Sequence, residues 1–442
     1  MISATESPAW AQLTSGVRDA LERALSGIAL APDDGYRLIS SRPDELSAII
    51  AAAGQLRDRG RGRTVTYSRK VFIPLTNLCR DKCGYCTFVK APGHPEANTM
   101  DPHEVRAVAE AGRARGCKEA LFSLGERPEE RYALARNHLR RVGYTRTNEY
   151  LAAMCEMVFE ETGLIPHANA GVMSRDDLLA LREVNGSMGL MLESTSDRLL
   201  ERGQAHFGCE GKVPSVRLQM MEMAGELGIA FTTGILIGIG ETLEERVDSL
   251  CAIRELHQRY GHIQEVIIQN FRVKPTIRMK HWAEPSVTDM LRTIAIARLM
   301  LGPQMNIQAP PNLFLEDGGL PPLPMGEGWG EGGAASAGRD RFGAAAELVE
   351  RRGVAGYLAA GINDWGGVSP VTIDHINPER AWPAIAALRE TTRGAGLELR
   401  ERLCLYPEYL RRPEFVRERL RGQMEVWTDE TGLVREEETR WN

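Results

Sequence analysis

The stretch that decides the fold runs from Val71 to Gly93 and reads VFIPLTNLCRDKCGYCTFVKAPG. Its first five residues are almost entirely apolar and predict a short buried strand. Cys79, Cys83 and Cys86 follow in the spacing C-x3-C-x2-C, so a loop with three thiols comes directly after that strand. Thiolates are the usual protein ligands of iron–sulfur clusters, and barrel enzymes place their chemistry just beyond the carboxyl ends of strands.

The three thiols are open to two interpretations. A 4Fe-4S cluster has four irons, so three cysteines would leave one iron free for a ligand, with the aromatic ring of Tyr85 beside it. The alternative is a zinc site, in which His94 would add a fourth ligand to the three cysteines. The loop alone does not decide between them.

Length and composition describe an ordinary globular protein. The 442 residues are 43% hydrophobic and 26% charged, and no apolar run is long enough for a membrane span. The net charge of −6 and the lack of a basic block argue against a nucleic-acid partner. Scattered charges and no apolar signal core near the N-terminus predict a cytoplasmic protein. The cysteines outside the loop are far apart and are expected to be buried free thiols.

Strand-like and helix-like segments alternate from residue 67 to residue 377, and polar residues stand where the strand-like segments end. This alternation predicts an α/β fold of parallel βα units closed into a (β/α)8 barrel. Residues 1–66 have apolar residues at helical spacing and are expected to form an N-terminal helical extension. Residues 378–442 are expected to form a C-terminal segment of charged helices.

The last βα unit is predicted to follow a segment of unusual composition. A helix at Arg341–Arg352 and a strand near Gly356–Ala360 would complete the barrel. Residues 318–340 are rich in Gly, Pro, Ala and Ser and contain no β-branched residue, which predicts a disordered insert. The alternative is a lid over the mouth of the barrel, anchored by Trp329.

The cysteine spacing, with an aromatic residue before the third cysteine, resembles the radical S-adenosylmethionine (SAM) superfamily. In that family one open iron of a 4Fe-4S cluster binds SAM, and an electron from the cluster cleaves SAM to a 5'-deoxyadenosyl radical. The resemblance implies SAM contacts at Tyr85 and at Gly125-Glu126. Those last two residues match the end of the family's Gly-Gly-Glu motif, which holds the methionine ammonium.

Three further SAM positions follow from the same resemblance. Glu193, after the fourth predicted strand, corresponds to an acid that binds the ribose hydroxyls. Arg217 lies seventeen residues before Gly234 and corresponds to an arginine that pairs with the SAM carboxylate in the biotin-synthase-like branch. Gly238 belongs to Gly234–Glu241, GILIGIGE, which matches the family's G-x-I-x-G-x-x-E pattern apart from Leu for the Ile. Together these matches favour the cluster over the zinc site.

The carboxyl-terminal half carries a more specific resemblance. Residues 361–370 (GINDWGGVSP), residues 374–379 (DHINPE) and Gln269-Asn270-Phe271 closely resemble the deazaflavin-forming subunits of FO synthases. FO is 7,8-didemethyl-8-hydroxy-5-deazariboflavin, a precursor of coenzyme F-420. The resemblance covers about residues 65–425, except for the insert and part of residues 127–144, and it implies that polar loops at the catalytic face bind the substrate. The residues so implied are Asn270, Asn363, Asp364, Trp365, Ser369, Asp374 and His375.

The implied substrate is an adduct of a ribitylated diaminouracil with a 4-hydroxybenzyl group taken from tyrosine. The family converts it to FO with release of ammonia, methionine and 5'-deoxyadenosine. One cysteine triplet implies one half of the pathway only, so an adduct-forming partner enzyme and an external electron donor are expected. The alternatives are a related radical SAM enzyme, either that partner or a menaquinone-pathway homologue, and a non-enzymatic iron–sulfur or zinc module.

Overall fold

The computed structural model describes residue 10, residues 12–313 and residues 353–439. Its centre is a barrel of eight parallel strands in the order β2-β3-β4-β5-β6-β7-β8-β1, closed by the pairing of β1 with β2. The predicted (β/α)8 barrel is therefore confirmed. In chain order the strands are β1 Thr64–Pro74, β2 Glu119–Ser123, β3 Ile165–Asn169, β4 Ser187–Gly189, β5 Phe231–Ile237, β6 Ile263–Asn270, β7 Ile307–Gln308 and β8 Asp364–Val368.

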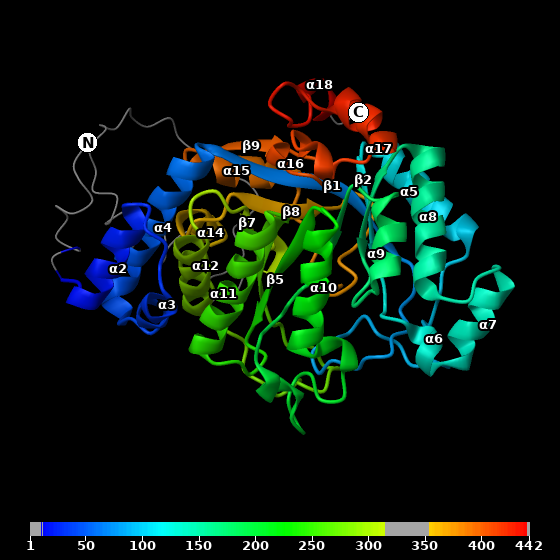
Figure 1. Ribbon diagram of the computed structural model, residues 1–442, viewed down its shortest axis with the longest axis horizontal. Helices are drawn as coiled ribbons and strands as arrows, with labels where there is room; N and C mark the ends of the chain where they lie inside the picture. The colour runs from blue at the N-terminus through cyan, green and yellow to red at the C-terminus, as the bar shows by residue number, and fades with distance from the viewer. Residues whose placement is uncertain (1–9, 11, 314–352, 440–442) are drawn as a thin grey trace, which may run out of the picture.

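Helices follow the strands and cover the outside of the barrel (Figure 1). Ser174, Thr242 and Ser286 each cap one of them, with a hydroxyl that accepts a backbone N–H of the first turn. The helices that cover the barrel or lie at its rim are α5 Pro102–Ala114, α6 Pro128–Arg131, α7 Ala133–Arg141, α8 Thr147–Thr162, α9 Arg175–Arg182, α10 Pro214–Glu226, α11 Leu243–Tyr260 and α12 Val287–Leu301.

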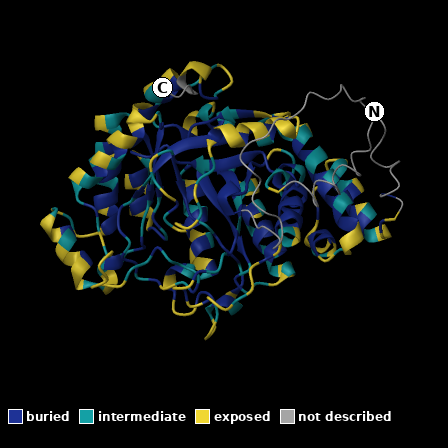
Figure 2. Ribbon diagram, turned by 180° about the vertical axis from the view of Figure 1, so that it is seen from behind, coloured by how far each residue is buried: buried dark blue, intermediate teal, exposed yellow. Residues whose placement is uncertain are grey.

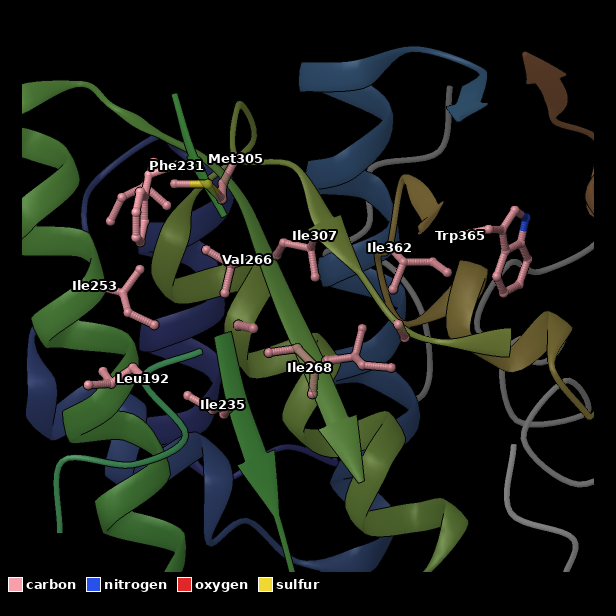
Figure 3. Packing of buried hydrophobic residues seen from close by; sticks show 14 of the residues in the cluster. Leu192, Phe231, Ile235, Ile253, Val266, Ile268, Met305, Ile307, Ile362 and Trp365 are labelled. Carbon is pink, nitrogen blue, oxygen red and sulfur yellow. The ribbon is translucent and has the colours of Figure 1, made fainter. Parts of the chain in front are cut away.

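The hydrophobic core lies between the strands and these helices. In Figure 3, Val266, Ile268 and Ile307 extend from neighbouring strands, and Ile253 approaches them from α11. All are buried, and each such side chain contributes about 1.5–3 kcal/mol relative to an exposed position. Figure 2 shows the same division across the molecule, with buried strands inside and exposed residues on the outer faces of the helices.

The N-terminal extension consists of α2 (Ser15–Leu25), α3 (Pro32–Ile39) and α4 (Leu46–Arg61), which lie together at one side of the barrel (Figure 1). α4 packs on α12, and α3 packs on α11. Gly60 permits the close approach of α4, because a Cβ there would lie 2.0 Å from the carbonyl oxygen of Pro303. The extension thus forms a further layer of helices outside α11 and α12.

The last strand is not where the sequence places it. Gly356–Ala360, predicted as a strand, falls largely in the helix α14 (Ala355–Ala359), and the barrel is completed by β8 instead. The glycines of β8 resemble a turn, but they make room for neighbours: a Cβ on Gly367 would lie 2.3 Å from Cε of Lys70. The predicted insert at 318–340 and the predicted helix at Arg341–Arg352 lie outside the described residues.

The C-terminal segment contains helices, as predicted, and also a strand. Its helices are α15 Ile385–Gly394, α16 Pro407–Leu410, α17 Glu418–Trp427 and α18 Glu436–Thr439. The strand β9 (Glu398–Glu401) pairs in parallel with the first half of β1. Directly after β9, Arg402 enters the amino-terminal end of the barrel and pairs with Asp364 at 2.6 Å and with Glu265 at 2.9 Å.

Across the parts of the chain that the structure describes, no helix is both long and apolar enough to cross a bilayer.

Candidate active site

A cavity of about 370 Å³ lies inside the barrel and reaches the loops at the carboxyl ends of the strands. Side chains two residues apart on one strand point to the same face. The side chains that point into the barrel therefore form successive levels along the strands, from the floor toward the carboxyl ends. On β1 the levels are Lys70 and then Phe72, and on β3 they are His167 and then Asn169. The loops that follow the strands form the rim.

All three cysteines of the loop after β1 line this cavity, and all are free thiols. The sulfur of Cys79 accepts the backbone N–H of Asp81 at 3.4 Å and that of Glu126 at 3.2 Å. Burial raises the pKa of the Cys79 thiol to about 12, and the two N–H groups oppose that effect. The same N–H groups would stabilise a thiolate bound to a metal.

The geometry favours a cluster over a single ion. Within the described residues, no three His, Cys, Asp or Glu side chains are grouped closely enough to hold one metal ion. His94, the fourth ligand of the zinc alternative, is exposed, and its Nδ1 accepts the backbone N–H of Glu96. The three sulfur atoms can lie farther apart around a 4Fe-4S cluster than around a single ion, because each thiolate binds a different iron. The loop therefore fits the cluster.

Glu126 lies beside the cysteine loop, and its carboxylate already has partners. Arg80 pairs with Oε1 at 2.7 Å, and the backbone N–H of Val172 donates to Oε2 at 2.9 Å. Two glycines leave room for the carboxylate. A Cβ on Gly171 would lie 2.3 Å from one of its oxygens, and a Cβ on Gly211 would lie 2.4 Å from the other. An ammonium group bound here would share the carboxylate with Arg80.

Glu193 is held in an unusual conformation at the cavity wall. Its φ of 65° lies in the left-handed region, which non-glycine residues seldom adopt outside functional sites. Its Oε1 pairs with Nζ of Lys212 at 2.6 Å, whereas Oε2 is buried without a hydrogen-bond partner. Burial would raise the pKa of Glu193, but the charges of Lys212 and Arg217 outweigh burial and lower it. The charged Oε2 is thus available to accept a hydrogen bond from a ligand hydroxyl.

Arg217 extends from α10 into the cavity wall and is buried, so it is not an exposed helix charge. Its Nε donates to the carbonyl of Gly211 at 2.7 Å, and its Nη1 donates to the carbonyl of Met191. Gly238 lies outside the cavity lining, where a Cβ would meet the ring of Pro285 at 2.6 Å.

Tyr85 lines the cavity between two residues that no sequence motif marks. Its hydroxyl lies 3.1 Å from Nε2 of His206, and Nζ of Lys212 lies 5.7 Å from its ring centre. Both partners belong to the irregular segment between β4 and α10, where the sequence carries neither periodicity nor a known motif. Their place beside the cysteines follows only from the folded chain.

Two of the predicted substrate residues, Asn270 and Asp374, line the cavity with polar side chains, and Trp365 lines it as well. Asn270 donates its amide N–H to the carbonyl of Leu313 at 3.1 Å, which leaves Oδ1 buried without a partner. Asn312, which the sequence does not indicate, donates to Asp374 at 2.9 Å and likewise keeps a buried Oδ1 without a partner. The rim therefore offers two fixed acceptors to a ligand.

Three other predicted substrate residues serve the framework. The Asn363 side chain accepts from Arg298 at 2.8 Å, and Asp364 pairs with Arg402 below the cavity. Trp365 touches the cavity, but its indole N–H donates to a hydroxyl of α15 at 3.0 Å. Their side chains are therefore occupied by the barrel itself.

Ser369 and His375 also lie outside the cavity lining. The Ser369 hydroxyl accepts the backbone N–H of Thr372 at 2.9 Å and so closes a turn after β8. Burial lowers the pKa of His375, which is therefore a neutral ring in the loop.

The sequence profile of the radical SAM superfamily matches residues 73–250. The 7,8-didemethyl-8-hydroxy-5-deazariboflavin synthase of Methanopyrus kandleri is 47% identical over 348 residues, which cover 79% of this chain and 93% of that protein. The chain belongs to this radical SAM family. Family membership implies a 4Fe-4S cluster and SAM, and the loop cysteines for the cluster are present.

Longer relatives match as well. The FO synthases of Mycobacterium tuberculosis and Streptomyces coelicolor are 45% and 44% identical over 439 and 435 residues. Each match covers 96% of this chain but only 47% and 46% of the relative. The chain thus spans about half the length of these FO synthases.

Solved structures of more distant proteins share the fold. The FeFe-hydrogenase maturase HydG from Carboxydothermus hydrogenoformans superposes with a TM-score of 0.64 at 16% identity, over 93% of this chain and 89% of that one. Methylornithine synthase gives a TM-score of 0.61 at 18% identity, over 86% and 97%. At such identities the likeness concerns the fold alone.

Proposed function

We propose that this chain forms FO from the adduct of ribityl-diaminouracil and a 4-hydroxybenzyl group. The observation that carries the proposal is the 47% identity across 93% of a deazariboflavin synthase. In this conversion the adduct loses ammonia and two hydrogens while a new ring closes. One hydrogen leaves as an atom to the 5'-deoxyadenosyl radical, and the other leaves as a proton and an electron, which the oxidised cluster would accept.

Cys79, Cys83 and Cys86 are the proposed ligands of three irons of the cluster, so the fourth iron is free for SAM. When bound, the cluster supplies the electron that cleaves SAM to methionine and the 5'-deoxyadenosyl radical. The backbone N–H groups that reach Cys79 stabilise negative charge on its sulfur. The protein thereby supports a charged cofactor in a largely buried place.

The SAM residues proposed from the family fit around the upper cavity. Arg217 is assigned to the SAM carboxylate, and the free Oε2 of Glu193 is assigned to the ribose hydroxyls. Glu126, with the backbone at Gly125, is assigned to the methionine ammonium beside Arg80. Tyr85 would present its ring edge to the same ligand. Gly238 is assigned only to the shape of the loop after β5, because it does not line the cavity.

The substrate is assigned to the rest of the cavity, whose size suits a small molecule. The two acceptors at the rim, Oδ1 of Asn270 and Oδ1 of Asn312, each lack a partner and would accept hydrogen bonds from the ribityl hydroxyls. A closed wall keeps water and other hydrogen donors away from a substrate radical.

The proposed setting is the cytoplasm, with an external electron donor and a partner enzyme. The partner would make the adduct from tyrosine and ribityl-diaminouracil. Support comes from the FO synthases, in which this chain accounts for about half of the length. The other half is then the natural place for the adduct-forming activity.

Product analysis separates this function from its relatives. Reconstituted protein, SAM and reductant are supplied under anaerobic conditions either with the adduct or with tyrosine and ribityl-diaminouracil. FO should form from the adduct and not from the two precursors, as judged by mass spectrometry. Adduct formation from the precursors would instead make the chain the adduct-forming partner.

A further inference from the structure

The floor of the cavity is polar, and no step proposed above uses it. Lys70, His167, Thr232 and Glu265 line it from four different strands. Lys70 gives one N–H to Glu119 at 2.7 Å, and its ammonium group has further N–H groups to offer. These side chains lie within their strands, two to five residues before the carboxyl ends, whereas the cysteines, Glu126 and Glu193 lie in loops beyond the strands.

His167 presents a lone pair to the cavity. The Ser187 hydroxyl donates to the carbonyl of Cys404 at 3.0 Å, so its oxygen accepts from Nδ1–H of His167 at 2.7 Å. Nδ1 therefore carries the hydrogen, and Nε2 is an acceptor. Burial lowers the pKa of His167 to about 4, so the ring is neutral near pH 7.

Nε2 is accessible because its neighbour on β4 has no side chain. A Cβ on Gly189 would lie 3.2 Å from Nε2. Among the residues that the structure describes, none forms a hydrogen bond with Nε2, and His167 itself is only 6% exposed. A buried acceptor of this kind is stable when a ligand supplies the donor.

The level directly above the floor is largely apolar. The lining residues above the floor include Phe72, Leu121, Met191 and Ile267, with Asn169 and Gln308 as the polar members. Gly234 belongs to the same level, and its Cβ would collide with the carbonyl oxygen of Ile267 at 2.0 Å. A group that reaches the floor therefore passes mainly apolar side chains along its length and meets polar groups at its tip.

We propose that the floor is a subsite for a phenol hydroxyl, which donates to Nε2 of His167 and accepts from Nζ of Lys70. This assignment rests on the proposed function, in which the 4-hydroxybenzyl ring is the only flat apolar part of the substrate with a polar tip. A ribityl chain carries a hydroxyl on nearly every carbon, and the apolar level would leave those hydroxyls unpaired. The polyol then belongs at the rim, beside Asn270 and Asn312.

The test compares the adduct with an analogue that has a benzyl group in place of 4-hydroxybenzyl. Equilibrium binding to the SAM-loaded protein without reductant is measured for wild type, His167→Leu and Gly189→Ala. Wild type should prefer the adduct by roughly ten- to a hundredfold, as expected for a hydrogen-bonded hydroxyl near a charge. His167→Leu should reduce the preference to about threefold or less. Gly189→Ala should reduce it as well, because its Cβ would lie 3.2 Å from Nε2 and cover it while the imidazole itself is retained.

The matched control is His262→Leu, which removes another buried histidine that lies outside the cavity. It should leave the preference unchanged. A full preference in both His167→Leu and Gly189→Ala would overturn the subsite. A second comparison uses an adduct whose ribityl chain lacks hydroxyls. If His167→Leu and Gly189→Ala lose the preference for the hydroxylated chain instead, the ribityl chain and not the phenol reaches the floor, and the subsite is overturned.

A simpler pair of probes separates the subsite from the proposed function. Wild type should bind 4-methylphenol more tightly than toluene, and His167→Leu should not. If the adduct fails to bind wild type while this difference persists, the proposed substrate is wrong and the subsite stands. Equal binding of the two probes by wild type overturns the subsite.

Discussion

Arg217 is the residue that tests the SAM assignment most closely, because no simple motif marks it. It is buried at the cavity wall, and two carbonyl groups hold its guanidinium in place. Arg217→Ala should weaken SAM binding by roughly ten- to a hundredfold, since a charge-assisted hydrogen bond contributes about 1.5–3 kcal/mol. Arg217→Lys should recover part of the affinity, because lysine keeps the charge and loses the planar fork.

Titration of SAM into reconstituted protein measures this effect, and the absorption spectrum reports on the cluster. Arg175→Ala removes an exposed arginine that pairs with Glu226 and serves as the control. Unchanged SAM affinity in Arg217→Ala would show that the guanidinium only supports the backbone of the cavity wall.

His262 makes stability depend on pH. It is fully buried between the rings of Phe231 and Tyr260, and burial lowers its pKa to about 3 from an ordinary value of 6.5. As the pH falls below 6.5, the unfolded chain therefore takes up a proton before the folded protein does. The stabilisation is complete above pH 6.5 and is lost progressively toward pH 3.

Urea unfolding of the apoprotein should show this loss. Between pH 6.5 and pH 4.5 the wild type should lose about 2–3 kcal/mol more unfolding free energy than His262→Leu, at about 1.4 kcal/mol per pH unit. Carboxylates that titrate in the same range affect both proteins alike. Equal losses in the two proteins would mean that folding does not lower the pKa of His262.

Single residues also show where sequence reasoning reaches its limit. The cysteine spacing is local, so the loop of three thiols after β1 could be predicted. The glycine pattern at the end of β5 is local too, but Gly238 lies outside the cavity lining. Lys212 and His206 come from an irregular segment, and only tertiary structure brings them to Tyr85. The resemblance implies a substrate role for Asn363 and Asp364, but the side chain of each is paired with a buried arginine in the folded chain.

Among the elements, β9 is the one that the sequence does not reveal. Its four residues lie in a charged segment, and the strand exists because β1 extends far enough to pair with it. The last barrel strand was misplaced for a related reason. The short apolar run at Gly356–Ala360 is compatible with a strand or a helix. The glycines of β8 are needed because the side chains of Lys70 and Gln308 leave no room for a Cβ there, and no local sequence pattern reveals that contact.

Arg402, directly after β9, closes the amino-terminal end of the barrel. Its guanidinium carbon lies 4.0 Å from the ring centre of Tyr406, and it pairs with Asp364 and Glu265. Arg402→Leu would leave two carboxylates in the barrel without their cation. It should lower the unfolding free energy by about 3–5 kcal/mol, the usual effect of breaking a buried ion pair.

Arg400→Leu is the matched control two residues earlier. Arg400 is partly exposed and pairs with Asp429 at 2.8 Å, so its loss should cost about 1 kcal/mol or less. Thermal or urea unfolding of both variants checks the difference. Similar small effects in the two would mean that the Arg402 network does not hold the barrel closed.

At the scale of the whole molecule, the barrel brings the cysteine loop, most of the residues proposed for SAM and two rim acceptors to one cavity. The alternation of strands and helices predicts this architecture, because each parallel strand needs a covering helix. The depth of the cavity and its polar floor depend on which inward side chains are small, as at Gly189 and Gly234. Such details arise from packing between strands that are distant in the sequence.

The most direct test of the account is a single anaerobic reaction of the reconstituted chain with the adduct, SAM and reductant. FO, ammonia and 5'-deoxyadenosine should appear together in equal amounts, detected by FO fluorescence and mass spectrometry. Cys83→Ala should abolish all three products, whereas Cys155→Ala, which removes a buried thiol outside the cavity, should not. Formation of 5'-deoxyadenosine by the wild type with the adduct left unchanged would contradict the proposed function.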